Sequence, residues 1–308
     1  MTKRLFRYLF AAGVVALVFG AMVAVRVVRV GAAESHYQLV EGWAQFPAGF
    51  AKWSPVSGVD VDAHDNVYVF QRSEAMPIMV FDRNGKFLRT FGQGVFKQPH
   101  FLRVDPSGDI WVTDRQNIQA YKFSSDGKLL MTLGKKGVPG DNSSQDAFNG
   151  VADVAVAKNG DVFIADGEGA NTRVVKLSKD GTFIKWWGGK GTEPGQFNVP
   201  HSIAMDSKGR IYVADRSNNR IQIFDQEGKF IDQWTNFGTP WGLFVKGDLI
   251  YVVDGTANGC LLIANIKDGK VVDRIDGLTN PTAVAVDSSG AIYVGEVNGM
   301  NVKKFVKK

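Results

Sequence analysis

Cysteine is almost absent from this sequence of 308 residues, because Cys260 is the only one. A single cysteine cannot form an internal disulfide bond. A catalytic thiol would need a histidine nearby in the fold, and neither His100 nor His201 belongs to the same part of the chain as Cys260. We therefore expect Cys260 to be a small, packed residue.

Acidic residues are missing from the first 33 positions, although five of the 36 basic residues lie there. The other 31 basic residues are matched by 31 acidic ones, so the body of the chain is neutral despite a formal net charge of +5. A surface that binds nucleic acid normally carries a basic surplus on the domain itself. The sequence therefore argues against a nucleic-acid partner.

An apolar run covers residues 8–25, between a basic start and two arginines, Arg26 and Arg29. The small residues Gly31, Ala32 and Ala33 that follow resemble a signal-peptide cleavage site. The run is long for a signal peptide and close to the minimum that spans a bilayer as a helix. Residues 1–33 are thus either a cleaved signal peptide or a retained membrane anchor, and the two arginines favour retention. Either outcome places residues 34–308 outside the cytoplasm, in the periplasm or secreted.

The rest of the chain repeats one unit, seen most clearly in residues 197–225. Each unit contains short apolar runs, rich in β-branched and aromatic residues, which are typical of β-strands. Asn-Gly or Asp-Gly turns recur between the last two runs, at positions 84–85, 126–127, 180–181 and 268–269. Such turns are strong hairpin signals, because both residues can adopt positive φ. A repeat of roughly 40 to 50 residues with four strands predicts a β-propeller.

The number of units indicates how the ring closes. The second strand of the unit occurs six times, but the last unit, residues 279–306, ends after its third strand. Residues 37–46 are rich in apolar side chains and precede the first unit, so we expect them to supply the missing outermost strand. The predicted fold is all-β, with one six-bladed β-propeller over residues 34–308 preceded by the signal or anchor helix. Closure of this kind removes a free sheet edge.

Histidine is also scarce, and two of the four histidines occupy one position of the repeat. His100 follows Pro99 and His201 follows Pro200, each just before the first strand of its blade. The first strand of a blade lines the central channel, so both imidazoles should point toward the axis at one mouth. This arrangement suits ligands of an axial metal ion. The alternative is a remnant of the repeat that only caps its loop.

Arginine recurs directly after the second strand, as Arg72, Arg115 and Arg216. A guanidinium at this place can bind a carboxylate through two parallel hydrogen bonds. For Arg115 we expect a structural role, either an ion pair with Asp114 or a loop hydrogen bond. Arg72 follows Gln71 instead of an acid, which leaves its guanidinium free for a ligand. Because first and second strands are antiparallel, the arginines and histidines should share one mouth of the channel.

The unit resembles the NHL repeat, most clearly over residues 200–224, from Pro-His through Ile-Tyr-Val-Ala-Asp-Arg to Arg-Ile-Gln-Ile-Phe. Residues 37–306 as a whole resemble peptidyl-α-hydroxyglycine α-amidating lyase. The resemblance implies an enzyme that cleaves a peptidyl-α-hydroxyglycine into a peptide amide and glyoxylate. It also implies three axial histidines on a zinc ion, a nearby calcium ion, two substrate-binding arginines and a tyrosine that acts as base.

The resemblance places part of this site on the chain. The first two zinc-binding histidines fall on His100 and His201, and the two arginines fall on Arg72 and Arg216. The base tyrosine falls on a stretch where Glu168 stands instead. Two histidines and a carboxylate can still bind a metal, so Glu168 is either the third ligand or the base.

Other positions depart further from the family pattern. Main-chain oxygens that bind calcium in the family would come from Val59 and Leu102. The third histidine falls on Thr282, a poor zinc ligand, and the calcium-binding aspartate falls on Ala283.

Two functions therefore remain open from the sequence. The first is a metal-dependent, lyase-like enzyme with an altered site, acting on a small peptide-like or carboxylate substrate. The second is a non-catalytic propeller, held at a membrane through residues 8–25, that binds a peptide or protein partner. We expect a monomer in either case. Stoichiometric zinc in the purified protein would favour the enzyme.

Overall fold

The computed structural model describes residues 35–256 and 258–308. The segment in which the sequence predicts a signal or anchor helix lies outside the described residues, so that helix stays a prediction. Within the described ranges, no helix is long and apolar enough to cross a membrane.

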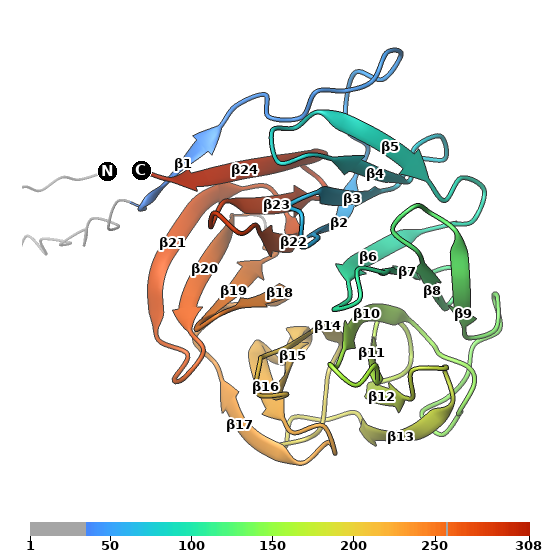
Figure 1. Cartoon of the computed structure of the whole chain (residues 1–308). Coiled ribbons are helices and arrows are strands. Elements are labelled where there is room, and N and C mark those ends of the chain that lie inside the picture. Colours follow the sequence, from blue (N-terminus) through green and yellow to red (C-terminus); the bar gives the residue numbers. More distant parts are fainter. Residues whose placement is uncertain (1–34, 257) are drawn as a thin grey trace, which may run out of the picture. The chain divides into compact units, whose positions relative to one another are not determined.

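Six antiparallel sheets of four strands stand around a central axis, as the repeat predicts (Figure 1). Blade one contains β2 (Val56–Val61), β3 (Val67–Gln71), β4 (Ile78–Phe81) and β5 (Phe87–Phe91). Blade two contains β6 (Pro99–Val104), β7 (Ile110–Asp114), β8 (Gln119–Phe123) and β9 (Leu129–Leu133). Blade three contains β10 (Val151–Val156), β11 (Val162–Asp166), β12 (Arg173–Leu177) and β13 (Phe183–Gly188).

The remaining three blades complete the ring. Blade four contains β14 (Pro200–Met205), β15 (Ile211–Asp215), β16 (Arg220–Phe224) and β17 (Phe230–Trp234), with a 3-10 turn, η1 (Arg216–Asn218), after β15. Blade five contains β18 (Pro240–Lys246), β19 (Leu249–Asp254), β20 (Gly259–Asn265) and β21 (Val271–Leu278). Blade six contains β22 (Pro281–Val286), β23 (Ile292–Glu296), β24 (Asn301–Lys307) and β1 (Tyr37–Val40).

The start of the chain closes blade six, as predicted. β1 pairs antiparallel with β24, with Tyr37 opposite Lys307 and Val40 opposite Lys304 (Figure 1). The strand is shorter than the sequence suggested, because the chain turns after Val40 through Gly42, whose φ is +62°. Beyond the turn, Trp43 leaves the sheet and packs in the interior, with its ring 5.1 Å from that of Tyr293.

The hydrophobic core is divided among the contacts between neighbouring blades. The cluster between blades six and one, for example, combines Val59 and Val69 of blade one with Ala283 and Tyr293 of blade six. Cys260 is buried in the cluster between blades four and five, which confirms its predicted place in the interior. Because each blade covers the apolar face of the next, the faces are buried only when the ring is complete.

A buried arginine ties four blades together near the axis. Arg103 of β6 forms a bidentate ion pair with Asp153 of β10, with its Nε 2.9 Å from Oδ1 of Asp153. The same guanidinium donates to the hydroxyl of Ser202 on β14 and to the main-chain oxygen of Leu243 on β18. Both oxygens of Asp153 are therefore engaged, and Ser202 and Ile203 also donate to it.

Candidate metal centre

A β-bulge lies at the start of the first strand of every blade. It sets the direction of the side chain that follows the first residue of the strand. The register of β6 shifts between Pro99 and Leu102, and that of β14 shifts between Pro200 and Ser202. A bulged residue is left outside the regular pairing, which re-aims its side chain. The residues directly after the first residue of these strands are Ser57, His100, Ala152, His201, Trp241 and Thr282.

Buried acids hold the segments that carry the two histidines. Asp114, at the end of β7, accepts hydrogen bonds from the main-chain N–H groups of Lys97 and Gln98. Asp215, at the end of β15, accepts the N–H of Asn198 in the same way. Each acid thus fixes the link that enters the first strand of its own blade, two or three residues before the histidine.

Both imidazoles are oriented by a carbonyl group of the next blade. Nδ1 of His100 lies 2.8 Å from the main-chain oxygen of Ala152, and Nδ1 of His201 lies 2.6 Å from that of Trp241. A carbonyl oxygen only accepts, so each Nδ1 carries a proton and donates it. Burial lowers the pKa of both side chains, that of His201 to about 3. Near pH 7 each ring is therefore neutral, with a free lone pair on Nε2.

The third side chain of the cluster, Glu168, comes from a tight glycine loop after β11. A Cβ atom on Gly167 would stand 2.4 Å from the main-chain oxygen of Pro200, and one on Gly169 would stand 2.4 Å from that of Asn149. The loop is closed by a hydrogen bond of 2.8 Å from the N–H of Glu168 to the oxygen of Gly150. Only glycine allows this close approach.

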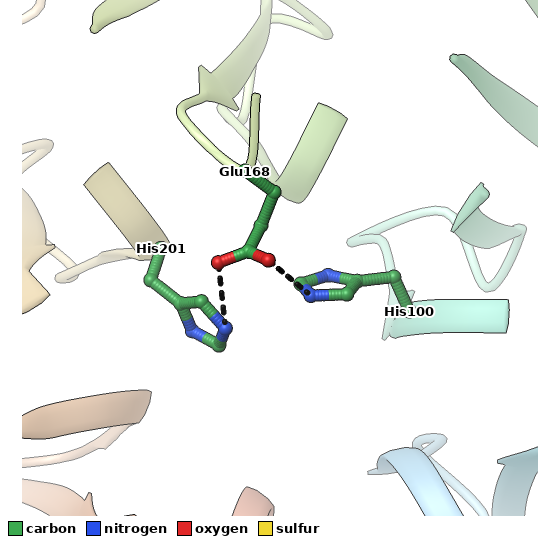
Figure 2. Close-up of side chains that lie close together, drawn as sticks. All are labelled: His100, Glu168 and His201. Carbon is green, nitrogen blue, oxygen red and sulfur yellow. Dashed lines mark ion pairs between the residues drawn. The ribbon is translucent and has the colours of Figure 1, made fainter. Parts of the chain in front are cut away.

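The carboxylate of Glu168 lies between the two imidazoles (Figure 2). Its Oε2 is 3.8 Å from Nε2 of His100, and its Oε1 is 3.5 Å from Nε2 of His201. The two imidazole rings face each other edge to face, with centroids 5.0 Å apart. All three side chains are almost fully buried, and that of Glu168 is 6% exposed.

Two arginines also contact Glu168. Nη1 of Arg216 lies 2.9 Å from Oε1 of Glu168, and Nε of Arg115 lies 3.5 Å from Oε2. Burial by itself raises the pKa of Glu168, but His201, His100, Arg216 and Arg115 oppose it and lower the pKa to about 2. Because the imidazoles are neutral near pH 7, the two arginines are the charges that keep this carboxylate ionised.

The three side chains fit a divalent metal ion. Their ligand atoms lie within 4.8 Å of one another, and within the described ranges no other group of three or more His, Cys, Asp or Glu residues does so. Zinc bonds of about 2.0–2.1 Å to nitrogen and oxygen put tetrahedral ligands about 3.3 Å apart, close to the spacings seen here. The lone pairs of both imidazoles face carboxylate oxygens, which are themselves acceptors. Oε1 of Glu168 forms an ion pair with Arg216 but accepts no well-aligned hydrogen bond from the described residues. A cation between them satisfies all three groups.

The structure brings the histidines and arginines together at one mouth of the channel, as predicted. Arg72 joins the group there, since its Nε donates to the main-chain oxygen of Pro99, next to His100. We call the end of the channel that carries His100, Glu168, His201, Arg72, Arg115 and Arg216 the histidine mouth. The role of each residue in binding or catalysis stays a prediction.

Of the two expectations for Arg115, the structure has the loop hydrogen bond. The Nε of Arg115 donates to the main-chain oxygen of Glu168 in the loop of the next blade, and it also lies near the carboxylate of Glu168. Trp241 was not among the predicted site residues, although its ring centroid lies 4.7 Å from Cζ of Arg216. A signal was present, because Pro240 and Trp241 occupy the repeat position of the Pro-His pairs.

The calcium expected from the family resemblance does not fit this chain. Calcium needs six to eight oxygen ligands, with carboxylates among them. Beside Val59 and Leu102, the carboxylate position is filled by Ala283, which is fully buried among apolar side chains. The axial carboxylate of Asp153 is already paired with Arg103. We therefore assign no calcium ion to these residues.

Comparisons with known proteins agree with the repeat pattern. The chain matches the NHL repeat family at residues 96–117 and 197–224. NHL repeat-containing protein 3 of Homo sapiens is 33% identical over 293 residues, which cover 88% of this chain and 84% of that protein. A probable peptidyl-α-hydroxyglycine α-amidating lyase of Caenorhabditis elegans is 31% identical over 237 residues, which cover 71% of this chain and 67% of that protein.

Solved structures support the architecture alone. A streptogramin B lyase superimposes with a TM-score of 0.61 at 18% identity, over 88% of this chain and 98% of the other. Repeat pattern, six-bladed ring and sequence identity lead to one assignment: the chain belongs to the family of NHL-repeat β-propellers that includes NHL repeat-containing protein 3 and the peptidyl-α-hydroxyglycine α-amidating lyases.

Proposed function

We propose that the histidine mouth is the active site of a metal-dependent, lyase-like enzyme that acts on a small substrate bearing a carboxylate. The observation that carries the proposal is the inward-facing cluster of two neutral imidazoles and one carboxylate. A divalent ion held there, with zinc the best match to this ligand set, would act as a Lewis acid on a substrate oxygen.

The arginines bind the substrate in this proposal. The side chains of Arg115 and Arg216 are 45% and 21% exposed, so both can be reached from the mouth. Their planar groups match a carboxylate bidentately, as does that of Arg72. Trp241 stacks on Arg216 and fixes its orientation. A substrate carboxylate anchored on these groups has its neighbouring carbon beside the three-residue cluster.

The lyase reaction of the family breaks a C–N bond. The substrate hydroxyl loses its proton, its oxygen forms a carbonyl with the α-carbon, and the C–N electron pair leaves on the amide nitrogen, which takes up a proton. With a pKa of about 2, Glu168 is a weak base and is better suited to hold a cation. Of its two possible roles we therefore favour that of ligand, with water at the open mouth receiving the hydroxyl proton.

A non-catalytic scaffold that binds a peptide or protein is the second candidate. It is favoured by one observation, which is that Glu168 stands where the family has its tyrosine base. The two candidates share the fold and differ in whether bound substrate is turned over.

An activity assay separates them. The zinc-loaded full-length chain should release glyoxylate from benzoyl-α-hydroxyglycine faster than zinc in buffer does. The variant Arg216→Gln should raise the half-saturating substrate concentration about tenfold or more, because a hydrogen bond to a charged group contributes about 1.5–3 kcal/mol. Binding of zinc and substrate without release of glyoxylate would refute the enzyme and favour the scaffold.

Metal binding should depend little on pH in the acidic range. A pKa of about 3 keeps His201 unprotonated well below pH 6, burial lowers the pKa of His100 as well, and Glu168 stays ionised to about pH 2. Protons therefore begin to compete for the ligands only as the pH approaches the lowered values. Two histidines with ordinary pKa values near 6.5 would lose about 100-fold in zinc affinity between pH 7.5 and 5.5, and the loss here should be much smaller. Competition with a chromophoric chelator measures this, and a loss near 100-fold would contradict the proposed ligand set.

We also propose that the propeller works outside the cytoplasm, either in the periplasm or secreted. The support is the sequence of residues 1–33, with its basic start and long apolar run. Fractionation that finds the chain in the cytoplasm with Met1 still present would overturn this part of the proposal.

A further inference from the structure

We infer that Glu168 couples the two ligands of the histidine mouth, so that a divalent metal ion and a small carboxylate bind cooperatively. The inference rests on the proposed function, and it adds a regulatory role: without metal, Glu168 acts as a built-in competitor for the arginines that bind the carboxylate.

The competition follows from the contacts of Glu168 with two arginines. Its Oε1 is 2.9 Å from Nη1 of Arg216, and its Oε2 is 3.5 Å from Nε of Arg115. These are the guanidinium groups that a ligand entering the mouth would meet. A carboxylate ligand must therefore displace, or share the arginines with, a carboxylate that the protein already supplies.

The same two oxygens face the imidazoles. Oε1 is 3.5 Å from Nε2 of His201, and Oε2 is 3.8 Å from Nε2 of His100. A divalent ion in this space would draw the negative charge of Glu168 toward itself and away from the arginines. Glu168 cannot satisfy both sets of partners fully, because its side chain is buried and its loop is held by close glycine contacts.

The charges of the mouth predict that the metal ion and the carboxylate strengthen each other's binding. The mouth holds three guanidinium groups, on Arg72, Arg115 and Arg216, against one carboxylate. A divalent cation on neutral imidazoles and Glu168 raises the positive charge of the mouth by two. An anion therefore binds more tightly once the metal is present, and by reciprocity the metal binds more tightly once the anion is present.

The ligand class follows from the donors. A guanidinium group presents two parallel N–H donors, and the two oxygens of a planar carboxylate accept one hydrogen bond from each. N-acetylglycine is a suitable probe, because it carries a peptide-like amide and one carboxylate. Its methyl ester has the same shape without the charge and serves as the ligand control.

Titration calorimetry on the full-length chain tests the coupling. The affinity for N-acetylglycine should rise about tenfold or more when zinc is bound, within the usual range of coupling between sites. The methyl ester should show no such rise. In the variant Arg216→Gln the rise should shrink, because one of the two guanidinium groups that pair with Glu168 is missing. Direct ligation of the metal by the probe would leave the rise unchanged and would contradict the coupling through Glu168.

A variant that needs no metal gives an independent test. Glu168→Gln removes the competing charge, so metal-free protein of this variant should bind N-acetylglycine about tenfold or more tightly than metal-free wild type. Glu227→Gln is the matched control, because Glu227 is exposed and pairs with Lys176 and Lys185 elsewhere. Unchanged affinity in Glu168→Gln would overturn the inference.

The outcomes separate the inference from the proposed function. If zinc does not bind, the proposed function fails, while the metal-free comparison of Glu168→Gln with wild type still tests whether Glu168 competes for the arginines. If zinc binds with equal affinity in the presence and absence of N-acetylglycine, the coupling fails and the metal site stands.

Discussion

Replacing His201 with alanine should abolish zinc uptake by the propeller and leave it folded. Loss of a partner that only orients a ligand costs about 10–100-fold in metal affinity, so loss of the ligand itself should cost at least about 100-fold. The ring should survive, because His201 belongs to none of the apolar clusters between blades, and the acid that fixes its segment, Asp215, is untouched.

Matched variants make this result specific. His64→Ala removes an exposed histidine far along the chain from the cluster and should leave zinc uptake unchanged. His100→Ala should repeat the loss seen for His201→Ala. Circular dichroism and thermal unfolding check that each variant is folded. Zinc uptake that survives both substitutions at the mouth would mean that the metal, if any, binds elsewhere.

The largest loss of stability is expected from Arg103→Met. Removing one partner of a buried ion pair leaves the other charge unpaired, which costs about 3–5 kcal/mol in unfolding free energy. Here Asp153, whose side chain is fully buried, loses its ion-pair partner, and buried Asp60 loses a nearby positive charge. The hydrogen bonds from Arg103 to Ser202 and Leu243 are lost as well. Equilibrium unfolding in urea measures the change.

Two further variants test the physical reason. Arg274→Met breaks an ion pair with Asp276 that is half exposed, so it should cost less than about 1 kcal/mol. The double variant Arg103→Met with Asp153→Leu removes both charges and should recover much of the stability, because apolar residues often replace a buried pair without loss. A double variant no more stable than Arg103→Met alone would show that the packing of Arg103, and not the unpaired acid, determines the cost.

Much of the fold was predictable because each blade is built from local signals. Turn residues and apolar runs repeat at a fixed interval, and counting strands was enough to assign residues 37–46 to the last blade. The predicted strand was too long because Gly42 permits a turn that ends it at Val40. Such a boundary depends on one residue with positive φ and is hard to separate from an apolar strand that continues to Trp43.

The positions of the site residues were predictable from the repeat, but their partners were not. Equivalent places in the repeat brought His100 and His201 to one mouth. The partner of Arg115 depends on where the loop of the next blade projects, and Gly167 shifts Glu168 one residue beyond the arginine position. Distances across the axis are set by the closed ring, which no local pattern in the sequence encodes.

The axial pair was missed for a related reason. Arg103 occupies a place in its first strand where blades three, four and six have alanine, as shown by the strand pairing of Ala155, Ala204 and Ala285. A charged residue in a channel strand predicts a buried partner. Which acid it meets becomes visible only when the strands stand side by side around the axis.

Anomalous X-ray scattering at the zinc edge, from a crystal of the zinc-loaded protein, would locate the metal ion. We predict one strong peak in the propeller, bounded by Nε2 of His100, Nε2 of His201 and the carboxylate of Glu168, at bond lengths of about 2.0–2.2 Å. No peak is expected beside Val59 and Leu102. A cluster without a peak, in which Glu168 still pairs with Arg216, or a peak at another place in the ring, would rule out the proposed metal centre.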